Sequence, residues 1–427
     1  VLEKVWVACL IVESTHTVPY DHATDKVCVD AFVYGECPHC GCEYSGTECE
    51  GGGALVLDAE LINPVNLLGT PLEHRPLRRL FLRLDALHDE LERFAASTTL
   101  PAFAKLFVEG WLDRGLPEVC LTNPNSAGVP VNIAGLENLK FTVPMEYVPR
   151  HLLAIEKMHA LQGESRLWHE IAGDEFPELA ILFGVDNAFG RLLVIPAVLS
   201  ALGLSEFMPR YVIPNHMMLL EGQKFSTSRH HAIWVDEYIT AENAQALRFY
   251  LCKNRTHRHE VDFHRHEFER FNAEFWNGQL PAMLDAANPV FQPFTDQENL
   301  PGPGQWCADC NSFFAATSVF IASIKQSYSL SMPDIRKITR SIENMVDEIT
   351  TFCLDAALQQ KPVFTHSALN RTRARLTARA LISLATALHP IAPEFSQVLY
   401  DRFNIRNPSF SLFSVDWMAV ELNNHPG

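Results

Sequence analysis

The chain has 427 residues, a length that predicts roughly two or three domains rather than a single compact one. Hydrophobic residues make up 47% of it, and its formal net charge of −17 means that any nucleic-acid ligand must be met by locally concentrated basic residues. The 11 cysteines are an odd number spread too widely for a disulfide framework, and no apolar run reaches the length of about 18 residues that spans a membrane. We therefore expect a cytoplasmic globular protein with no membrane segment.

The first residues carry neither an initiator Met nor the basic region and cleavage site of a secretory signal. We therefore expect that no such signal is present and that a segment upstream is missing. Residues 30–60 are rich in Cys and Gly and indicate a small knuckle. Residues 72–118 show helical spacing of their apolar positions, which are Leu77, Leu80, Phe81, Leu84, Leu87 and Leu91.

Residues 140–235 alternate apolar, strand-like runs with helical ones. Leu179–Phe183 and Arg210–Ile213 are predicted strands, and Leu192–Leu202 is the predicted helix between them. This alternation predicts a parallel α/β layer. From Ala241 to the end the pattern is almost wholly helical, apart from a Pro/Gly-rich loop at Asn288–Gly304, and it predicts a helical bundle.

A hexamer with small hydroxyls between cations follows a strand-like segment, and it reads Lys224-Phe225-Ser226-Thr227-Ser228-Arg229. Such a loop can hold a triphosphate through backbone N–H groups and the charge of a lysine. A solvated basic turn is the alternative, and the hexamer taken alone would favour it.

A cysteine-rich segment offers a metal site. Cys37 and Cys40 have the C-x2-C spacing that lets two thiolates converge on one ion within a single turn. Cys42 and Cys49 follow, but no second C-x2-C closes the set, so Cys42 or His39 would have to supply the missing ligand. A zinc site and a metal-free knuckle held by packing are both consistent with this pattern.

A histidine cluster lies further along the chain, where four histidines fall within ten residues: His257, His259, His264 and His266. Alternating histidines can bind a metal ion, but no cysteine or paired spacing supports a site. A solvated surface is the favoured interpretation.

Two more segments carry polar residues beside predicted elements. Gly184-Val185-Asp186-Asn187 places a carboxylate at a predicted helix N-terminus, where the helix dipole stabilises it, so a plain N-cap is the alternative. Phe141–Tyr147 contains Pro144 and Tyr147, and its alternative interpretation is a buried strand end with a structural tyrosine.

Together these segments resemble the methionyl-tRNA synthetases, which are class I aminoacyl-tRNA ligases. The resemblance covers nearly all of this chain but only the later part of a full synthetase. The hexamer resembles the KMSKS loop, and Leu247–Leu251 resembles the LRYYL helix that follows it. The other similar patterns are GKDN for Gly184–Asn187, DAPIGY for Phe141–Tyr147, the connective-peptide zinc knuckle for Gly35–Cys40, WLxxGL for Trp111–Leu116 and the anticodon-bundle signature for Ala387–Pro393.

The resemblance implies a fold class of α/β plus all-α. A partial Rossmann-type catalytic domain would carry an inserted connective domain with a zinc-knuckle-like segment, followed by a helical bundle of the anticodon-binding type. The implied domains are a remnant of the catalytic domain at 1–29, the insertion at 30–135, the second half of the Rossmann-type domain at 136–240 and the bundle at 241–427.

The resemblance also implies ATP with Mg²⁺, an amino-acid substrate and a Zn²⁺ site. The implied catalytic residues are Lys224, Ser226, Thr227 and Ser228, and those that bind the nucleotide are Lys224, Arg229 and Gly184. The implied substrate-binding residues are Asp186, Asn187, Arg191, Tyr147, Pro144, Glu146 and Lys140. The implied metal ligands are Cys37, Cys40, Cys49 and Cys42. The hexamer is expected to face the same cavity as Asp186 and Tyr147.

The positions that would do the chemistry depart from the family pattern. Thr227 stands where the family has a second lysine, and a hydroxyl cannot supply that positive charge in the transition state. Lys140, Glu146 and Arg191 would place charges in a pocket that should hold a thioether. Charges in such a pocket are costly without partners, which argues for a different and polar amino acid.

Two further departures concern partners. Pro281, Asp285 and Gln359 stand where the family has the Asn, Arg and Trp that contact the anticodon, which weakens the case for tRNA as a partner. The HIGH tetrapeptide of the first Rossmann half is absent, because no His-x-Gly-His occurs in the 427 residues. We therefore expect that half to lie outside this sequence or to come from a partner chain.

Three hypotheses follow. The first is a ligase that activates an amino acid other than methionine as its adenylate and passes it to tRNA or a small acceptor. The alternative is a catalytically inactive paralogue that binds RNA or protein, and the second alternative is an ordinary methionine-tRNA ligase. The substituted pocket favours the first, because a pocket released from selection would more often gain small or apolar residues than several charges.

Overall fold

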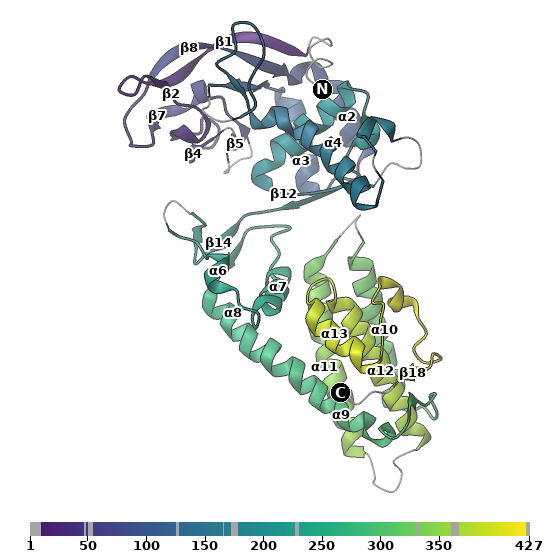
Figure 1. The fold of residues 1–427 in the computed structure, drawn as a ribbon. Helices are drawn as coiled ribbons and strands as arrows, with labels where there is room; N and C mark the ends of the chain where they lie inside the picture. Colours follow the sequence, from purple (N-terminus) through teal and green to yellow (C-terminus); the bar gives the residue numbers. More distant parts are fainter. Residues whose placement is uncertain are drawn as a thin grey trace. The chain divides into compact units, whose positions relative to one another are not determined.

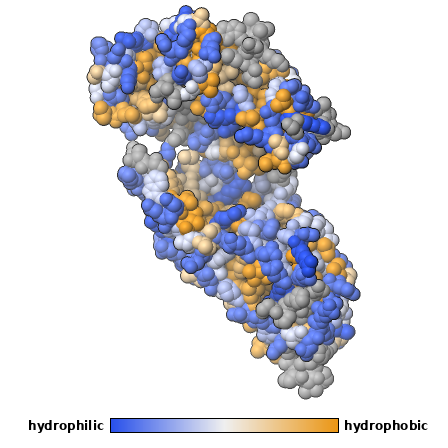
Figure 2. All heavy atoms as spheres, in the orientation of Figure 1, coloured by the Kyte–Doolittle hydropathy of each residue, from blue (hydrophilic) through white to orange (hydrophobic). Residues whose placement is uncertain are grey.

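The structure is a computed structural model, and it describes all residues except 1–9, 47, 50–53, 125–127, 165, 172–177, 227–229, 330–332, 360–366 and 424–427. Two compact units make up the chain (Figure 1): unit 1 comprises Val1–Met217 and His257–His259, and unit 2 comprises Met218–Thr256 and Glu260–Gly427. On the face shown in Figure 2, hydrophilic residues are interspersed with hydrophobic ones over both units. Within the described residues, no helix combines the length and apolar character needed to cross a membrane.

The largest sheet of unit 1 has four strands in the order β2-β1-β8-β9. These are β2 (Lys26–Val27), β1 (Ile11–Asp21), β8 (Glu73–Arg83) and β9 (Glu118–Cys120). The helical spacing predicted for Leu77 to Phe81 is wrong, because these residues lie in β8. Leu80, Phe81 and Leu82 are all buried there, and a short apolar run buried on both faces does not reveal its period.

Helices follow directly after β8, and the helical spacing predicted at Leu91 is confirmed. Leu91 and Phe94 form the buried face of α2 (His88–Ser97), which packs against α3 (Ala102–Arg114). Helix α3 begins after Pro101 and ends at Gly115, whose φ of 95° few other residues adopt.

Small sheets form the cysteine-rich region and the segment just before residue 143. A three-stranded sheet has the order β4-β3-β7, and two pairs of strands are β5-β6 and β10-β11. Their bounds are β3 (Val33–Glu36), β4 (Glu43–Ser45), β5 (Glu48–Cys49), β6 (Ala54–Leu55), β7 (Ile62–Asn66), β10 (Thr122–Asn123) and β11 (Lys140–Phe141).

The predicted α/β layer is confirmed in the last part of unit 1. Strand β12 (Ala180–Gly184) pairs in parallel with β13 (Tyr211–Asn215). The chain crosses between them through a π-helix (Gly190–Val194) and α5 (Ile195–Ala201), and α4 (Val143–Leu161) packs on both. Parallel strands need such a crossover, so this region is a strand–helix–strand unit.

Unit 2 begins with a three-stranded sheet in the order β15-β14-β16. Strand β14 (Met218–Leu220) pairs antiparallel with β15 (Gln223–Lys224) and parallel with β16 (Val261–Phe263). The helices are α6 (Val235–Tyr238), α7 (Ala244–Lys253), α8 (Arg265–Phe271), a π-helix (Asn272–Gln279), α9 (Leu280–Phe291), α10 (Ala308–Ser327), α11 (Ile335–Gln359), α12 (Ala368–Leu388) and α13 (Pro393–Arg402). Strands β17 (Asn299–Leu300) and β18 (Leu422–Asn423) pair near the end of the chain.

The Pro/Gly-rich loop begins later than predicted. Helix α9 continues through Pro289 to Phe291, although the loop was expected to begin at Asn288. The hydrogen bond that proline removes is tolerated there because Val290 and Phe291 are buried in the core and the helix ends immediately afterwards.

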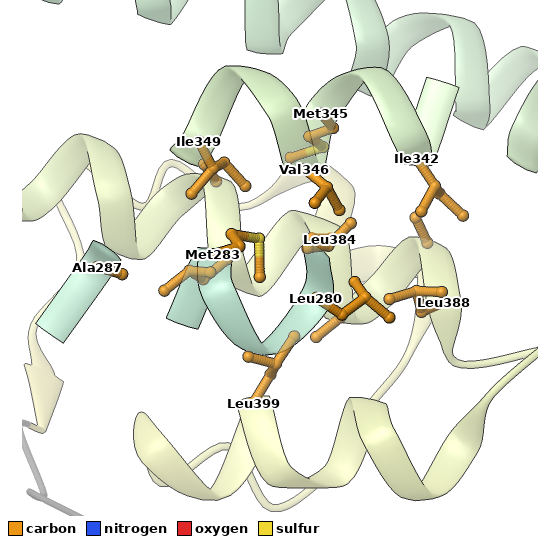
Figure 3. Close-up of a cluster of buried hydrophobic side chains, with 14 of the residues drawn as sticks. Leu280, Met283, Ala287, Ile342, Met345, Val346, Ile349, Leu384, Leu388 and Leu399 are labelled. Atoms are coloured by element: carbon orange, nitrogen blue, oxygen red, sulfur yellow. The ribbon is translucent and has the colours of Figure 1, made fainter. Parts of the chain in front are cut away.

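The helical bundle is built around α12. Nearly all of its residues are buried, and it packs against α9, α10, α11 and α13. Figure 3 shows apolar side chains from four helices converging, which are Leu280, Met283 and Ala287 of α9, Ile342, Met345, Val346 and Ile349 of α11, Leu384 and Leu388 of α12, and Leu399 of α13. The Ala- and Leu-rich part of α12 supplies apolar contacts to these neighbours, whereas its buried polar residues, such as Arg375, must find hydrogen-bond partners. Helices form most of the described residues after Ala241, as predicted, although β16, β17 and β18 lie among them and the compact unit already begins at Met218.

Candidate functional site

The turn after β12 holds the first candidate residues. Strand β12 ends at Gly184, and Val185–Asn187 forms a 3-10 turn. A side chain at position 184 would collide with the carboxylate of Asp186, so glycine allows that carboxylate to fold back over the strand end. Asp186 is half-buried and Asn187 is exposed. The turn therefore presents Asp186 at the carboxyl end of a parallel strand, where open α/β sheets bind ligands.

An arginine and a tyrosine meet at the π-helix that follows. Such helices are rare and occur frequently at functional sites. A side chain on Gly190 would collide with the ring of Tyr147 from α4, so the ring lies directly on the π-helix backbone. The Cζ atom of Arg191 is 5.2 Å from the centroid of that ring. Arg191 is half-buried, and among the described residues it forms no ion pair with a carboxylate.

The other predicted pocket residues lie around α4 and β11. Phe141 ends β11, so the segment does begin at a strand end and Tyr147 is buried as that interpretation had it, but Pro144 to Tyr147 lie in the first turns of α4. Pro144 lines an apolar cavity of about 20 Å³, which has room for about one water molecule. Glu146 forms an ion pair with Arg150 one turn along the same helix, and the stem of Lys140 lies against Gly128. Of the three predicted pocket charges, Arg191 is the one with a recorded ring contact to Tyr147.

His151 is a residue that sequence interpretation missed. It lies one turn after Tyr147 on α4, and its Nε2 is 2.7 Å from the carbonyl oxygen of Phe207. The pKa of His151 is lowered, chiefly by burial, with the charge of Arg191 acting in the same direction and the hydrogen bond to Phe207 opposing both. A neutral imidazole therefore lies near Arg191. The signal that would have identified it is its spacing from Tyr147, since residues four apart share one face of a helix.

The predicted phosphate loop belongs to a hairpin in unit 2. The two residues of its turn, Glu221 and Gly222, have φ angles of 49° and 79°, as the tightest hairpins require. Lys224 is exposed in β15, and Ser226 exchanges backbone hydrogen bonds with His231 at 2.8 and 2.9 Å. The remaining candidates of this loop, Thr227, Ser228 and Arg229, lie outside the described residues. The expectation that the loop faces Asp186 and Tyr147 joins two units and stays a prediction.

Three of the four predicted metal ligands come together in unit 1. The sulfur atoms of Cys37, Cys40 and Cys49 all lie within 4.8 Å of one another, and those of Cys40 and Cys49 are 3.4 Å apart. The backbone N–H of His39 donates to the Cys37 sulfur at 3.4 Å. A backbone hydrogen bond at Cys42 lowers the pKa of Cys40, and such bonds favour the thiolate form that binds zinc. Cys42 itself is exposed and lies outside the three-sulfur cluster, and Cys40 raises its pKa.

The cysteine cluster is adjacent to the first candidate turn. Strand β5, which contains Cys49, contacts the 3-10 turn that carries Asp186. A donor set of three thiols fits a zinc ion with one further ligand. A metal ion held there would therefore also stabilise β5, the strand against which the Asp186 turn packs.

The bundle carries the remaining candidate positions. Leu247–Leu251 lies within α7, as the sequence predicted. Pro281 and Asp285 are both exposed on α9, one turn apart, so they share one face of that helix. Gln359 is the last residue of α11, and its side chain lies outside the described part of the chain.

Comparison with known sequences gives a consistent set of relatives. Residues 2–282 match the family described as tRNA synthetases class I (M). The Methionine--tRNA ligase of Caldivirga maquilingensis is 32% identical over 243 residues, which are 56% of this chain and 42% of that protein. The Methionine--tRNA ligase of Sulfolobus acidocaldarius is 25% identical over 399 residues, which are 91% of this chain and 68% of that protein. The chain thus spans less than half the length of several relatives that it matches, with 42% and 40% for two of them.

Comparison with solved structures identifies the same fold. The Mycobacterium tuberculosis methionyl-tRNA synthetase in complex with methionyl-adenylate matches with a TM-score of 0.70 at 14% identity, over 99% of this chain and 76% of that one. The apo form of the same enzyme matches with a TM-score of 0.69 at 14% identity, over 100% of this chain and 78% of that one. At this identity the similarity establishes the fold, an α/β architecture with substantial helical content.

Proposed function

This chain belongs to the class I tRNA synthetases of the methionyl group, and we propose that it acts as an aminoacyl ligase that activates an amino acid other than methionine. The ligase would use ATP to form an aminoacyl adenylate and would pass the aminoacyl group to a tRNA or a small acceptor. Activity, substrate and partners are proposals, because the chain spans less than half the length of several relatives.

The observation that carries this proposal is the half-buried Arg191 beside Tyr147. A guanidinium carries several N–H donors in one plane, and taking it out of water is costly unless acceptors reach it. The contact with the Tyr147 ring stabilises the charge by about 0.5–1 kcal/mol at an exposed site but occupies no N–H group. A substrate side chain ending in a carboxylate or amide oxygen would supply strong acceptors, whereas the thioether of methionine is a weak one.

The residues proposed for the phosphates of ATP lie in unit 2, and those proposed for the amino acid lie in unit 1. The exposed ammonium of Lys224 and the backbone around Ser226 suit the phosphates, with Thr227, Ser228 and Arg229 completing the loop. Relatives of this class use ATP with Mg²⁺. The amino-acid carboxylate would attack the α-phosphorus of ATP, which would transfer the AMP group to that carboxylate and release pyrophosphate. Asp186 suits the α-amino group of the amino acid, and the neighbouring Gly184 and Asn187 shape the turn that holds it.

The helical bundle at 241–427 is the proposed surface for a tRNA acceptor. The family's anticodon-contacting residues are replaced at Pro281, Asp285 and Gln359, so a small acceptor is the alternative. A catalytically inactive paralogue that binds RNA or protein is a further alternative, and Thr227 supports it because that position carries a lysine in the family pattern. The half-Rossmann segment would lie elsewhere in the protein or come from a partner chain.

Activation of methionine is the second candidate function. The relatives described above are named Methionine--tRNA ligase. The ion pair between Glu146 and Arg150 also removes one of the charges that argued against a thioether. The two candidates differ in whether Arg191 contacts the substrate side chain.

We also propose that Cys37, Cys40 and Cys49 bind Zn²⁺, with Cys42 or water as the fourth ligand. Zinc would crosslink the knuckle that contacts the Asp186 turn. Metal analysis of the purified protein tests this assignment. Cys40→Ser should lose one equivalent of bound zinc, whereas Cys252→Ser, which changes a thiol outside the cluster, should keep the wild-type zinc content. Equal zinc content in both variants would exclude the site.

ATP–pyrophosphate exchange on the full-length protein that contains this chain tests the proposed function. Each standard amino acid is supplied separately, and the rate of label exchange is measured. Exchange with one amino acid bearing an oxygen acceptor supports the proposal. Exchange with methionine alone would support the second candidate, and exchange with none would favour the inactive paralogue.

A variant of the loop sharpens the same assay. Thr227→Lys restores the charge of the family pattern and should raise the exchange rate if the loop addresses ATP. An unchanged rate would count against that role of the loop.

A further inference from the structure

The turn of the Lys224 hairpin is anchored to a neighbouring strand and helix through Glu221. The Glu221 backbone N–H donates to the carbonyl oxygen of Phe263 at 3.1 Å. Its Oε1 accepts a hydrogen bond from the Arg265 backbone N–H at 2.9 Å, and its Oε2 lies 2.8 Å from Nδ1 of His264. A carboxylate held at both oxygens keeps one orientation, so Oε2 is fixed toward the imidazole.

A second histidine, His266, lies near the same carboxylate. One ligand atom each from Glu221, His264 and His266 lies within 4.8 Å of the other two, and the two imidazole centroids are 5.6 Å apart. Ligand atoms at about 2.0–2.2 Å from a shared zinc ion lie roughly 3–4 Å from one another. Small side-chain rotations therefore suffice to close the three groups around one ion.

Asp262 adds a feature that an ion pair between Glu221 and His264 does not explain. Its Oδ2 lies 3.2 Å from Nε2 of His264, the ring nitrogen that does not face Glu221. Its Oδ1 is buried and has no hydrogen-bond partner within the described residues. Metal-binding histidines almost always donate their second ring N–H to a carboxylate or carbonyl, which fixes the tautomer and the ring orientation. Asp262 occupies that position behind His264.

We propose that Glu221, His264 and His266 bind a divalent ion of the zinc class, with Asp262 orienting His264. Two imidazoles and one carboxylate suit Zn²⁺, whereas Ca²⁺ and Mg²⁺ prefer oxygen ligands throughout. With neutral imidazoles, the ionised Glu221 and Asp262 carry two negative charges, which a divalent cation neutralises. Three protein ligands leave one coordination position for water or a further ligand.

Such an ion would fasten the hairpin turn to the start of α8. Glu221 lies in the turn between β14 and β15, and His264 is 43 residues later at the N-cap of α8. The metal would therefore restrict movement of the hairpin that carries Lys224. This site lies in unit 2, apart from the cysteine cluster of unit 1, and it does not depend on the proposed ligase activity.

A Co²⁺ titration of the full-length, metal-depleted protein tests the proposal. Cobalt replaces zinc, and its near-ultraviolet and visible absorption separates a nitrogen and oxygen site from a cysteine site, because only thiolates add a sulfur-to-cobalt charge-transfer band. We expect a component without that band in the wild-type protein. Glu221→Gln and His266→Ala should each remove it, whereas His259→Ala, an exposed histidine outside the cluster, should retain it.

The affinity of the site gives a graded readout. Asp262→Asn should weaken Co²⁺ binding by about 10- to 100-fold without abolishing it, as expected for a group that orients a ligand. Identical titrations for the wild-type protein, Glu221→Gln and His266→Ala would overturn the proposal, as would a wild-type spectrum containing only the thiolate component.

A measurement on the unaltered chain covers the case in which a variant fails to fold. Zn²⁺ added to the wild-type protein should shift the imidazole NMR signals of both His264 and His266, while the His259 signal stays in place. The absence of a shift at both rings would overturn the proposal without the use of any variant.

Discussion

Arg375 in the bundle and Arg191 in the candidate site are both arginines in helices, yet they are satisfied differently. Arg375 is buried in α12 and donates to four backbone carbonyl oxygens, which belong to Leu300, Pro301, Trp417 and Val420. Arg191 lies in the π-helix of unit 1 and contacts the Tyr147 ring, with no carboxylate pair in the described part of the chain. Arg375 therefore ties separate chain segments together, whereas the half-buried Arg191 can donate to an oxygen acceptor of a ligand.

The largest expected effect concerns Arg79, another buried arginine. Its guanidinium is inaccessible to solvent and bonds to Asp58 at 3.0 Å and to the amide of Asn123 at 2.8 Å. Asp58→Ala should cost about 3–5 kcal/mol in the free energy of unfolding, because it leaves a buried charge without its counter-ion. Denaturant unfolding measures the loss, and amide exchange should locate it in β1 and β8.

The matched control for Asp58→Ala is Asp85→Ala. Asp85 pairs with Arg83 in the same region, but both side chains are almost half exposed. Its loss should change the free energy of unfolding by no more than about 1 kcal/mol. Equal effects of the two variants would show that burial does not determine how much the Arg79–Asp58 pair contributes to the free energy of unfolding.

The next largest effect should come from Arg375→Met. Methionine retains the apolar stem but removes the donors to the carbonyl oxygens in and beside β17 and in the segment before β18, of which that of Leu300 lies in a buried residue. We expect a loss of about 2–3 kcal/mol in the free energy of unfolding, with faster amide exchange near β17 and β18. Arg406→Met, in an exposed position of the same unit, is the control and should be nearly neutral. Unfolding midpoints that match the wild-type protein would contradict a structural role for Arg375.

The difference between apolar burial and the pairing of charged groups explains which features the sequence could predict. The α12 bundle and the β12–β13 pair were predicted because burial of apolar residues sets their pattern. Strand β8 was missed because Leu80, Phe81 and Leu82 are buried in succession, which suits either period. The apolar pattern alone carries no information about which charged groups will pair.

Polar neighbours were harder to predict than the scaffold. The ion pair of Glu146 with Arg150 follows only once that segment is known to be helical, since it depends on a spacing of one turn. His264 meets Glu221 only because β14 pairs in parallel with β16, a contact between distant parts of the chain that local pattern does not reveal. Sequence interpretation had assigned that histidine to a solvated surface.

A smaller effect is expected from Gly190→Ala. The added methyl group would collide with the Tyr147 ring, and displacing the ring should cost about 1–2 kcal/mol. Because the ring supports Arg191, any amino-acid activation should fall as well, and Tyr147 fluorescence or NMR signals should report the displacement. Gly110→Ala is the control, since a methyl group there meets only the end of the Arg114 side chain. Unchanged Tyr147 signals in Gly190→Ala would contradict the packing of the ring on this backbone.

The smallest expected effect is a pH dependence at the hairpin turn. In metal-free protein, the hydrogen bond with Glu221 raises the pKa of His264, and the same bond lowers the pKa of Glu221. The Glu221 contribution is present above its ordinary value of about 4.3 and is lost on acidification. The His264 contribution is present below about 6.5 and is lost as the pH rises through its raised pKa. The pair is therefore strongest between these values.

An NMR titration of the His264 imidazole measures this pH dependence. Asp262, Glu267 and His266 also face this histidine, so part of the raised pKa should survive removal of Glu221. In Glu221→Gln the pKa of His264 should fall toward the ordinary imidazole value. A pKa that does not move would show that the hydrogen bond to Glu221 is not what raises it.

The proposal that Arg191 selects the substrate is tested most directly by the amino-acid preference of ATP–pyrophosphate exchange in Arg191→Met, compared with Arg93→Met. Both changes replace an arginine with the same apolar side chain, but Arg93 is exposed on α2 and pairs with Glu90, outside the candidate site. We predict that Arg191→Met shifts the preference from an amino acid with an oxygen acceptor toward methionine, while Arg93→Met keeps the wild-type preference. The same preference in both variants and in the wild-type protein would contradict a role for Arg191 in selecting the substrate.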